Sequence, residues 1–144
     1  AGLPYALPGT PLEAKFSMQF LLSLACVYRK VELKHFSDDV LKDKRIIDLC
    51  KRVKFLAEND IVGSRVTIEL NNKNKYTAAV DKPRGHRKYP LNMEEVKDKF
   101  ISCAGVLFSE NEAEKVLGAI LEIDQLENIN SVTNALQCEF PKED

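Results

Sequence analysis

The 144-residue sequence has only two histidines, His35 and His86, and its four cysteines lie far apart without a Cys-x-x-Cys pair. A zinc site draws its ligands from clustered Cys, His and acidic residues, so we expect no metal site. Glycine-rich dinucleotide and phosphate-binding motifs, a His-Glu-x-x-His motif and a nucleophile elbow are also missing. No spacing of residues in the sequence defines a catalytic dyad by itself.

Neither sign of charge is in excess, because 21 Lys and Arg stand against 22 Asp and Glu, a net charge of −1. The chain therefore has no general attraction for nucleic acid or anionic membranes. The first residues lack the basic leader of a secretory signal peptide, and the dispersed cysteines beside apolar runs suit reduced, buried thiols. We expect a cytoplasmic protein. The absence of an initiator Met suggests a piece of a longer chain.

The longest apolar stretch, residues 16–28, contains only three polar residues. It is too short for a membrane span, which needs about 20 apolar residues. Thr10, Pro11 and Glu13 in front of it form a helix start with a capping box. We predict one central helix over residues 10–28, apolar on nearly every side and therefore buried. The residues expected to be mostly buried are Phe16, Phe20, Leu21, Leu24, Ala25 and Tyr28.

Further helices are indicated by periodicity and by capping signals. A helical region from Ser37 carries an apolar stripe over residues 46–53, with a break near Asp43. Capping boxes at 92–95 and 109–112 begin two more helices, and a last short helix covers residues 130–136.

Three segments have the alternation of strands. Residues 53–57 suggest a short strand, and residues 66–70 and 76–80 form a hairpin around the turn 71–74. The order of elements predicts an α+β fold, a single domain of residues 1–144 with helices packed on a small antiparallel sheet. Because two or three strands are a marginal sheet, we expect a further strand upstream of residue 1.

The loop from Lys82 to Tyr89 is the densest polar feature, with five basic side chains counting His86. It suits recognition of an anionic, carboxylate-bearing substrate through arginine hydrogen bonds. It also suits a nucleic-acid contact with Tyr89 as a stacking ring. The third interpretation is a solvated loop that balances the acidic residues 94–98.

Lys15 and Ser17 are polar residues in the first turns of the predicted central helix. Helix N-termini attract anions, so one or both could face a substrate cleft. Alternatively, Lys15 extends to solvent and Ser17 bonds to the preceding turn. His35, beside Phe36, is interpreted as structural.

Three segments together resemble the MmgE/PrpD family. These segments are EAKFSMQF at residues 13–20, LKDKRIIDL at 41–49 followed by Val53, and GHRKYPLNMEEVKDKF at 85–100. They occur in the family's order and at similar spacing. The Gly-His form of the loop and the Ser-Met-Gln run are most similar to the branch with cis-aconitate decarboxylase, the immune-responsive gene product.

The resemblance implies a lyase or isomerase that acts on small polycarboxylates without a cofactor, such as 2-methylcitrate dehydratase or cis-aconitate decarboxylase. It implies a homodimer in which each subunit has a large helical domain and a small α+β domain. This chain would be most of the small domain, without its N-terminal part and without the helical domain that carries most acid/base residues. The fragment alone would then be inactive.

The substrate-binding residues implied by the resemblance are Lys15, Ser17, Phe20, His86 and Arg87. The family often has Tyr at the position of Phe20, and a phenylalanine ring cannot donate a proton. The rival interpretation is a non-catalytic binding or regulatory module that uses the loop 82–89, without nucleic acid or membrane as a partner.

Overall fold

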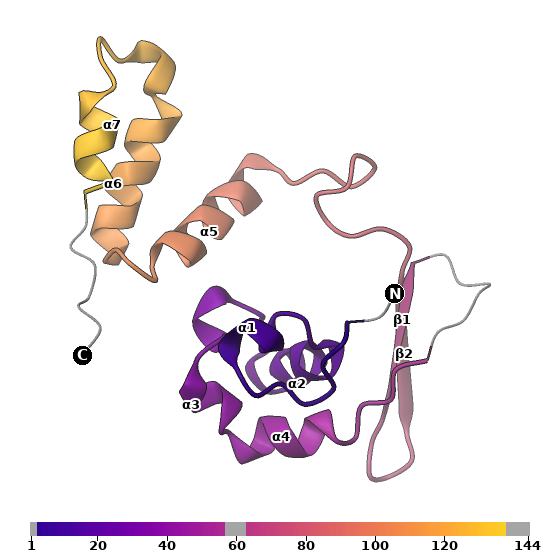
Figure 1. The fold of residues 1–144 in the computed structure, drawn as a ribbon. Coiled ribbons are helices and arrows are strands. Elements are labelled where there is room, and N and C mark those ends of the chain that lie inside the picture. Colours follow the sequence, from indigo (N-terminus) through magenta and orange to yellow (C-terminus); the bar gives the residue numbers. More distant parts are fainter. Residues whose placement is uncertain (1–2, 57–62, 138–144) are drawn as a thin grey trace. The chain divides into compact units, whose positions relative to one another are not determined.

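The computed structural model of the chain describes residues 3–56 and 63–137. The elements, in order, are α1 (Pro11–Ala14), α2 (Met18–Tyr28), the 3-10 helix η1 (Leu33–His35), α3 (Asp38–Leu41), α4 (Lys44–Cys50), β1 (Ser64–Glu69), β2 (Lys75–Val80), α5 (Met93–Ala104), α6 (Glu110–Leu121), the 3-10 helix η2 (Ile123–Gln125) and α7 (Asn130–Ala135) (Figure 1). Helices and one antiparallel pair of strands make this an α+β structure, as predicted.

The chain divides into two compact units. One unit consists of Ala1–Phe55 and Lys97–Asp144, and the other consists of Leu56–Val96. The first contains α1–α4, α6 and α7, and the second contains the hairpin and the loop that follows it. Helix α5 begins in the second unit and continues into the first.

The predicted central helix is two helices. Helix α1 ends at Ala14, and α2 begins after Ser17, whose backbone is extended at φ −117° and ψ 109°. The Ser17 hydroxyl accepts a hydrogen bond from the Phe20 amide at 3.1 Å, which is the N-cap interaction. Prediction of one helix over residues 10–28 was therefore wrong, because Ser17 starts a new helix where the periodicity suggested an interior turn.

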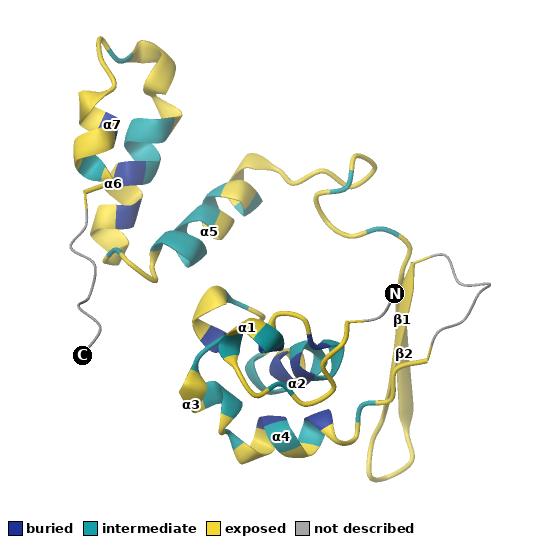
Figure 2. Cartoon of the chain, in the orientation of Figure 1, coloured by how far each residue is buried: buried dark blue, intermediate teal, exposed yellow. Residues whose placement is uncertain are grey.

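The core of the first four helices forms where α2 packs against α4. Its buried residues are Ala14, Phe20, Leu24, Ile46 and Cys50. Figure 2 shows buried stretches in dark blue on α2 and α4. Only one side of α2 is buried, so burial on nearly every side was also a wrong expectation.

The six residues predicted to be buried divide accordingly. Phe20 and Leu24 are buried, which confirms the prediction, and Leu21 and Tyr28 are half-buried. Phe16 is 48% exposed because it lies in the connection between α1 and α2. Ala25 is exposed because it follows the buried Leu24 by about 100° around the helix.

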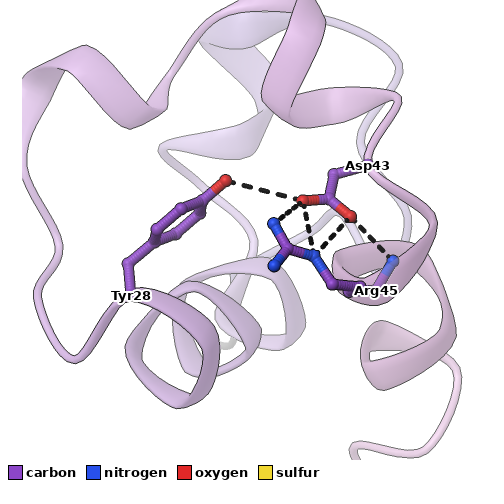
Figure 3. Close-up of polar contacts among 3 residues, drawn as sticks. All are labelled: Tyr28, Asp43 and Arg45. Atoms are coloured by element: carbon purple, nitrogen blue, oxygen red, sulfur yellow. Dashed lines mark hydrogen bonds and ion pairs between the residues drawn. The ribbon is translucent and has the colours of Figure 1, made fainter.

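Asp43 joins the end of α2 to the start of α4 (Figure 3). As the N-cap of α4, its carboxylate accepts the Arg45 amide at 2.8 Å, and the Arg45 guanidinium at 2.7 Å. The Tyr28 hydroxyl donates to the same carboxylate over a longer 3.5 Å. The Arg45 hydrogen bonds hold the pKa of Asp43 below its ordinary value. The predicted break near Asp43 is confirmed.

His35 is buried beside this junction. Its ring stacks on Tyr28 with the centroids 4.6 Å apart, and its Nδ1 accepts the Glu32 amide at 3.1 Å. This packing agrees with the structural interpretation of His35.

The hairpin is confirmed, with β1 and β2 antiparallel in the register Ser64↔Val80 through Glu69↔Lys75. The turn is closed by hydrogen bonds between Leu70 and Asn74 and between Lys73 and Leu70, with Lys73 left-handed at φ 69°. Residues 53–56 form no strand, contrary to prediction, and residue 57 lies outside the described residues.

The helices after the hairpin begin at the predicted capping boxes. In the box before α6, Ser109 and Glu112 bond to each other's amides, and Asn92 and Glu95 do the same before α5. The predicted last helix, 130–136, is α7. The capping box predicted at Thr10 and Glu13 departs from the pattern, because the Glu13 carboxylate accepts the Gly9 amide at 2.7 Å.

The cysteines are only partly buried. Cys50 is buried, Cys103 is half-buried and Cys26 is exposed, so burial of Cys26 was wrongly expected. All three are free thiols, and Cys138 lies outside the described residues. Burial raises the pKa of the Cys50 thiol. Within residues 3–56 and 63–137, no helix has the length and apolar character needed to cross a membrane.

We expect Leu24→Ala to lower the free energy of unfolding by about 2–5 kcal/mol, because it leaves a cavity at a core position. Leu24 is 0% exposed, whereas Leu12 of α1 is 66% exposed, so Leu12→Ala is the matched control with a small effect. Urea denaturation followed by circular dichroism measures both changes. Equal effects of the two substitutions would contradict the described core.

Candidate substrate-binding site

The five predicted site residues lie in two places. Lys15, Ser17 and Phe20 belong to the α1–α2 segment in the first unit, and His86 and Arg87 belong to the loop in the second. The structure groups the residues within each set. Joint action of the two sets stays a prediction.

Ser17 and Phe20 have clear structural uses. The Ser17 side chain is fully buried and caps α2, which is a different bond from the one to the preceding turn that the sequence suggested. The Phe20 ring is buried and lies 6.5 Å from the Phe36 ring, centroid to centroid. The sequence carried a signal for this cap, because apolar residues stand at the two hydrophobic-staple positions, Phe16 and Leu21, around Ser17.

Lys15 is exposed between the two helices. Its ammonium nitrogen lies 5.9 Å from the centroid of the Phe36 ring, a distance at which a cation is attracted to an aromatic face. Among the described residues it pairs with no carboxylate. Its charge is therefore available to an anion at the start of α2.

Gln19 is a polar residue of α2 that the sequence did not single out as a site residue. Its Oε1 atom is buried and accepts no hydrogen bond from the described part of the chain. Buried acceptors in proteins are nearly always paired. Gln19 therefore joins Lys15 as a side chain whose polar group is not used by the described fold.

The basic loop has a defined backbone. Gly85 is left-handed at φ 88°, and its amide donates to the Tyr89 carbonyl at 2.9 Å. The Tyr89 amide donates in turn to the His86 carbonyl at 2.7 Å. An L-residue with a side chain is strained at such a φ, so glycine suits this turn.

Arg84 anchors the loop to the first turn of α5. Its guanidinium pairs with the Glu95 carboxylate, with Nε 3.1 Å from Oε1 and a second contact from Nη2 to Oε2. Glu95 also accepts the Asn92 amide at 2.9 Å as part of the capping box. The Arg84 hydrogen bonds, followed by the Asn92 amide, hold the pKa of Glu95 below its ordinary value. Arg84 thus balances an acidic residue, as the solvated-loop interpretation expected.

His86 and Arg87 differ from Arg84. His86 is half-buried, and its Nδ1 accepts the Lys88 amide at 3.2 Å. Arg87 is exposed and makes no ion pair with the residues that the structure describes. These two neighbours can offer hydrogen bonds to an external carboxylate.

Groups of three or more His, Cys, Asp or Glu side chains that could hold a metal ion do not occur within the described ranges. Lys15 offers a cation in the first unit, and Arg87 and the His86 imidazole offer hydrogen-bonding groups in the second.

Comparison with known proteins adds a family. The sequence profile of the MmgE/PrpD C-terminal domain matches residues 4–125. The chain is 26% identical over 145 residues to a cis-aconitate decarboxylase of Aspergillus terreus, covering 94% of this chain and 29% of the relative. It is 21% identical over 136 residues to a cis-aconitate decarboxylase of Mus musculus, covering 90% of this chain and 28% of the relative. The chain thus spans less than a third of these relatives.

We expect Arg84→Ala to raise the pKa of Glu95, because the substitution removes the largest cause of its lowered value. The Asn92 amide remains, so the pKa should stay below that of an unfolded glutamate, about 4.3. Carboxyl-detected NMR titration measures this pKa in both proteins.

The sign of the pH effect follows from the lowered pKa. The Arg84–Glu95 pair stabilises the folded state above the unfolded pKa, and this stabilisation is lost as the pH falls through the folded pKa. In the Arg84→Ala protein that acid-dependent loss should be smaller. An unchanged Glu95 pKa would show that the pair does not form in solution.

Proposed function

Because the chain belongs to the MmgE/PrpD family, we propose that it is the C-terminal domain of a cofactor-free lyase or isomerase acting on small polycarboxylates. Cis-aconitate decarboxylation is the first candidate reaction, since the relatives carry that name. Dehydration of 2-methylcitrate is the second. The match over residues 4–125 is the observation that carries the proposal.

In this proposal the loop binds substrate carboxylates. Arg87 supplies an exposed guanidinium, which bonds a carboxylate with two parallel hydrogen bonds. His86 lies next to it on a backbone fixed by two turn hydrogen bonds. Fixed donors of this kind stabilise negative charge as it develops during a reaction without needing to reorganise.

The α1–α2 segment would contribute Lys15, with Ser17 and Phe20 shaping the wall beside it. Phe20 cannot supply the phenol that other members often have at its position, so a proton must come from elsewhere. The reaction would begin with proton removal beside a carboxylate, followed by loss of water or carbon dioxide or by reprotonation, and it needs positioned acid and base groups. We assign these groups to the large helical domain of the longer protein.

We further propose a cytoplasmic protein, from its dispersed cysteines, and a homodimer, from the family resemblance, with the helical domain completing each site. The alternative function is a non-catalytic binding or regulatory module, favoured by one observation: Arg87 and Lys88 are both exposed on a turn closed by backbone hydrogen bonds. Tight binding to RNA or DNA that weakens steeply with salt would support a nucleic-acid module instead.

We expect Arg87→Ala in the longer protein to reduce kcat/KM for cis-aconitate by about ten- to a hundred-fold, the value of a hydrogen bond to a charged group. Its thermal stability should hardly change, because Arg87 is exposed. Arg65→Ala is the matched control, since Arg65 is an exposed arginine of the same unit on β1. Equal kinetics of both variants would remove the loop from the site.

We expect residues 1–144 alone to fold and to catalyse no turnover of cis-aconitate, 2-methylcitrate or iminodisuccinate. Folding is expected because capping, hairpin and core signals agree with one another. Chromatography of each mixture measures the product. Turnover that Lys15→Ala or His86→Ala abolishes would show instead that this chain holds a complete site.

A further inference from the structure

We propose that His86 binds substrate as a neutral hydrogen-bond donor through Nε2, and that the Lys88 backbone amide fixes it in this form. The proposal rests on the proposed function, because it names the role of one side chain in the same loop. In this proposal His86 binds one carboxylate of the substrate, next to the carboxylate that Arg87 binds.

The first step is the tautomer. The Lys88 amide lies 3.2 Å from Nδ1 of His86, and a backbone N–H can only donate. Nδ1 therefore carries a lone pair and no proton. A neutral imidazole has one N–H, so the proton must be on Nε2, and the bond made by one nitrogen decides the state of the other.

The second step is the direction in which the ring is held. The Tyr89 amide binds the His86 carbonyl at 2.7 Å, and the Gly85 amide binds the Tyr89 carbonyl at 2.9 Å. Together with the bond to Nδ1, these contacts fix the backbone and one edge of the ring. The loop is further tied to α5 through Arg84 and Glu95. Nε2, on the opposite edge of the imidazole, makes no hydrogen bond with the residues that the structure describes, and we assign this nitrogen to a ligand.

The third step is charge. Arg84 is compensated by Glu95, whereas the exposed cations Arg87 and Lys88 make no ion pair within the described residues and remain for a ligand. A neutral Nε2–H adds a directed donor beside these cations without adding a further charge. The pair of Arg87 and His86 suits a di- or tricarboxylate with two carboxylates on neighbouring carbons, where one is held by the guanidinium and one by the imidazole.

The tautomer can be tested without any enzyme activity. Long-range proton–nitrogen NMR of residues 1–144 should show His86 Nε2 as the protonated nitrogen, at a pH where added base no longer changes the spectrum. His35 is an internal reference, because its Nδ1 accepts the Glu32 amide at 3.1 Å in the same way. Protonation of His86 on Nδ1 would overturn the proposal.

Two substitutions separate donation to substrate from support of the turn. His86→Gln keeps an N–H donor near the Nε2 position but loses the acceptor for the Lys88 amide, and His86→Asn keeps the acceptor but loses the outer donor. In the longer protein we expect His86→Asn to raise KM for cis-aconitate by about ten-fold or more, and His86→Gln to raise it by less than about three-fold.

The opposite order, with His86→Asn close to the parent and His86→Gln impaired, would make His86 a turn residue and overturn its contact with substrate. Unchanged KM in both variants would do the same. Failure of the proposed function is a separate result, because Arg87→Ala measures it. If Arg87→Ala has no effect while Nε2 of His86 is protonated, the loop binds no substrate although the His86 tautomer is right.

Discussion

The packing of α2 on α4 is the constraint on which the helical part of the structure depends. The contact buries Phe20, Leu24 and Ile46, and nothing else in α1–α4 buries side chains of that size so completely. Two polar devices place the helices for this contact. Ser17 begins α2, and Asp43 begins α4 while also accepting the hydroxyl of Tyr28 from the end of α2. The start of one helix is thus defined relative to the end of the other.

This arrangement explains why Ser17 and Phe20 look like site residues in the sequence and serve the fold in the structure. Both stand in the segment that resembles the family, next to the exposed Lys15 and the buried Gln19 oxygen, which accepts no hydrogen bond from the described residues. The hydroxyl of Ser17 is already used by the Phe20 amide. A ligand at this segment would therefore meet the charge of Lys15, beside helices that the Ser17 cap and the buried Phe20 ring hold in place.

Local signals in the sequence predicted much of the fold. The boxes at Asn92 and Ser109 and the turn at 71–74 were predictable because each is decided by atoms within a few residues. The break at Ser17 was missed because apolar periodicity continues across it, and only the cap and the staple residues Phe16 and Leu21 mark it. The exposed Ala25 was missed because the number of apolar residues in a helix does not say which face a neighbouring helix covers. The partner of Arg84 needed the structure, since three acidic residues stand within reach in the sequence and one of them, Glu95, takes it.

The ion-pair and hydrogen-bond partners that the loop residues take within the protein also decide what the loop can bind. A row of basic residues read from the sequence is equally compatible with nucleic acid and with a small acid, because it gives only a sum of charges. In the structure Arg84 is neutralised by Glu95, and His86 is tied to the Lys88 amide through Nδ1. Binding to a phosphate backbone strengthens with the number of protein cations along its length. A cation that is paired within the protein does not contribute to this binding. Binding of a small polycarboxylate depends on a few hydrogen-bond donors held at fixed positions. A turn closed by backbone hydrogen bonds supplies such donors. The local bonding of the loop therefore supports the proposal that it binds a small acid.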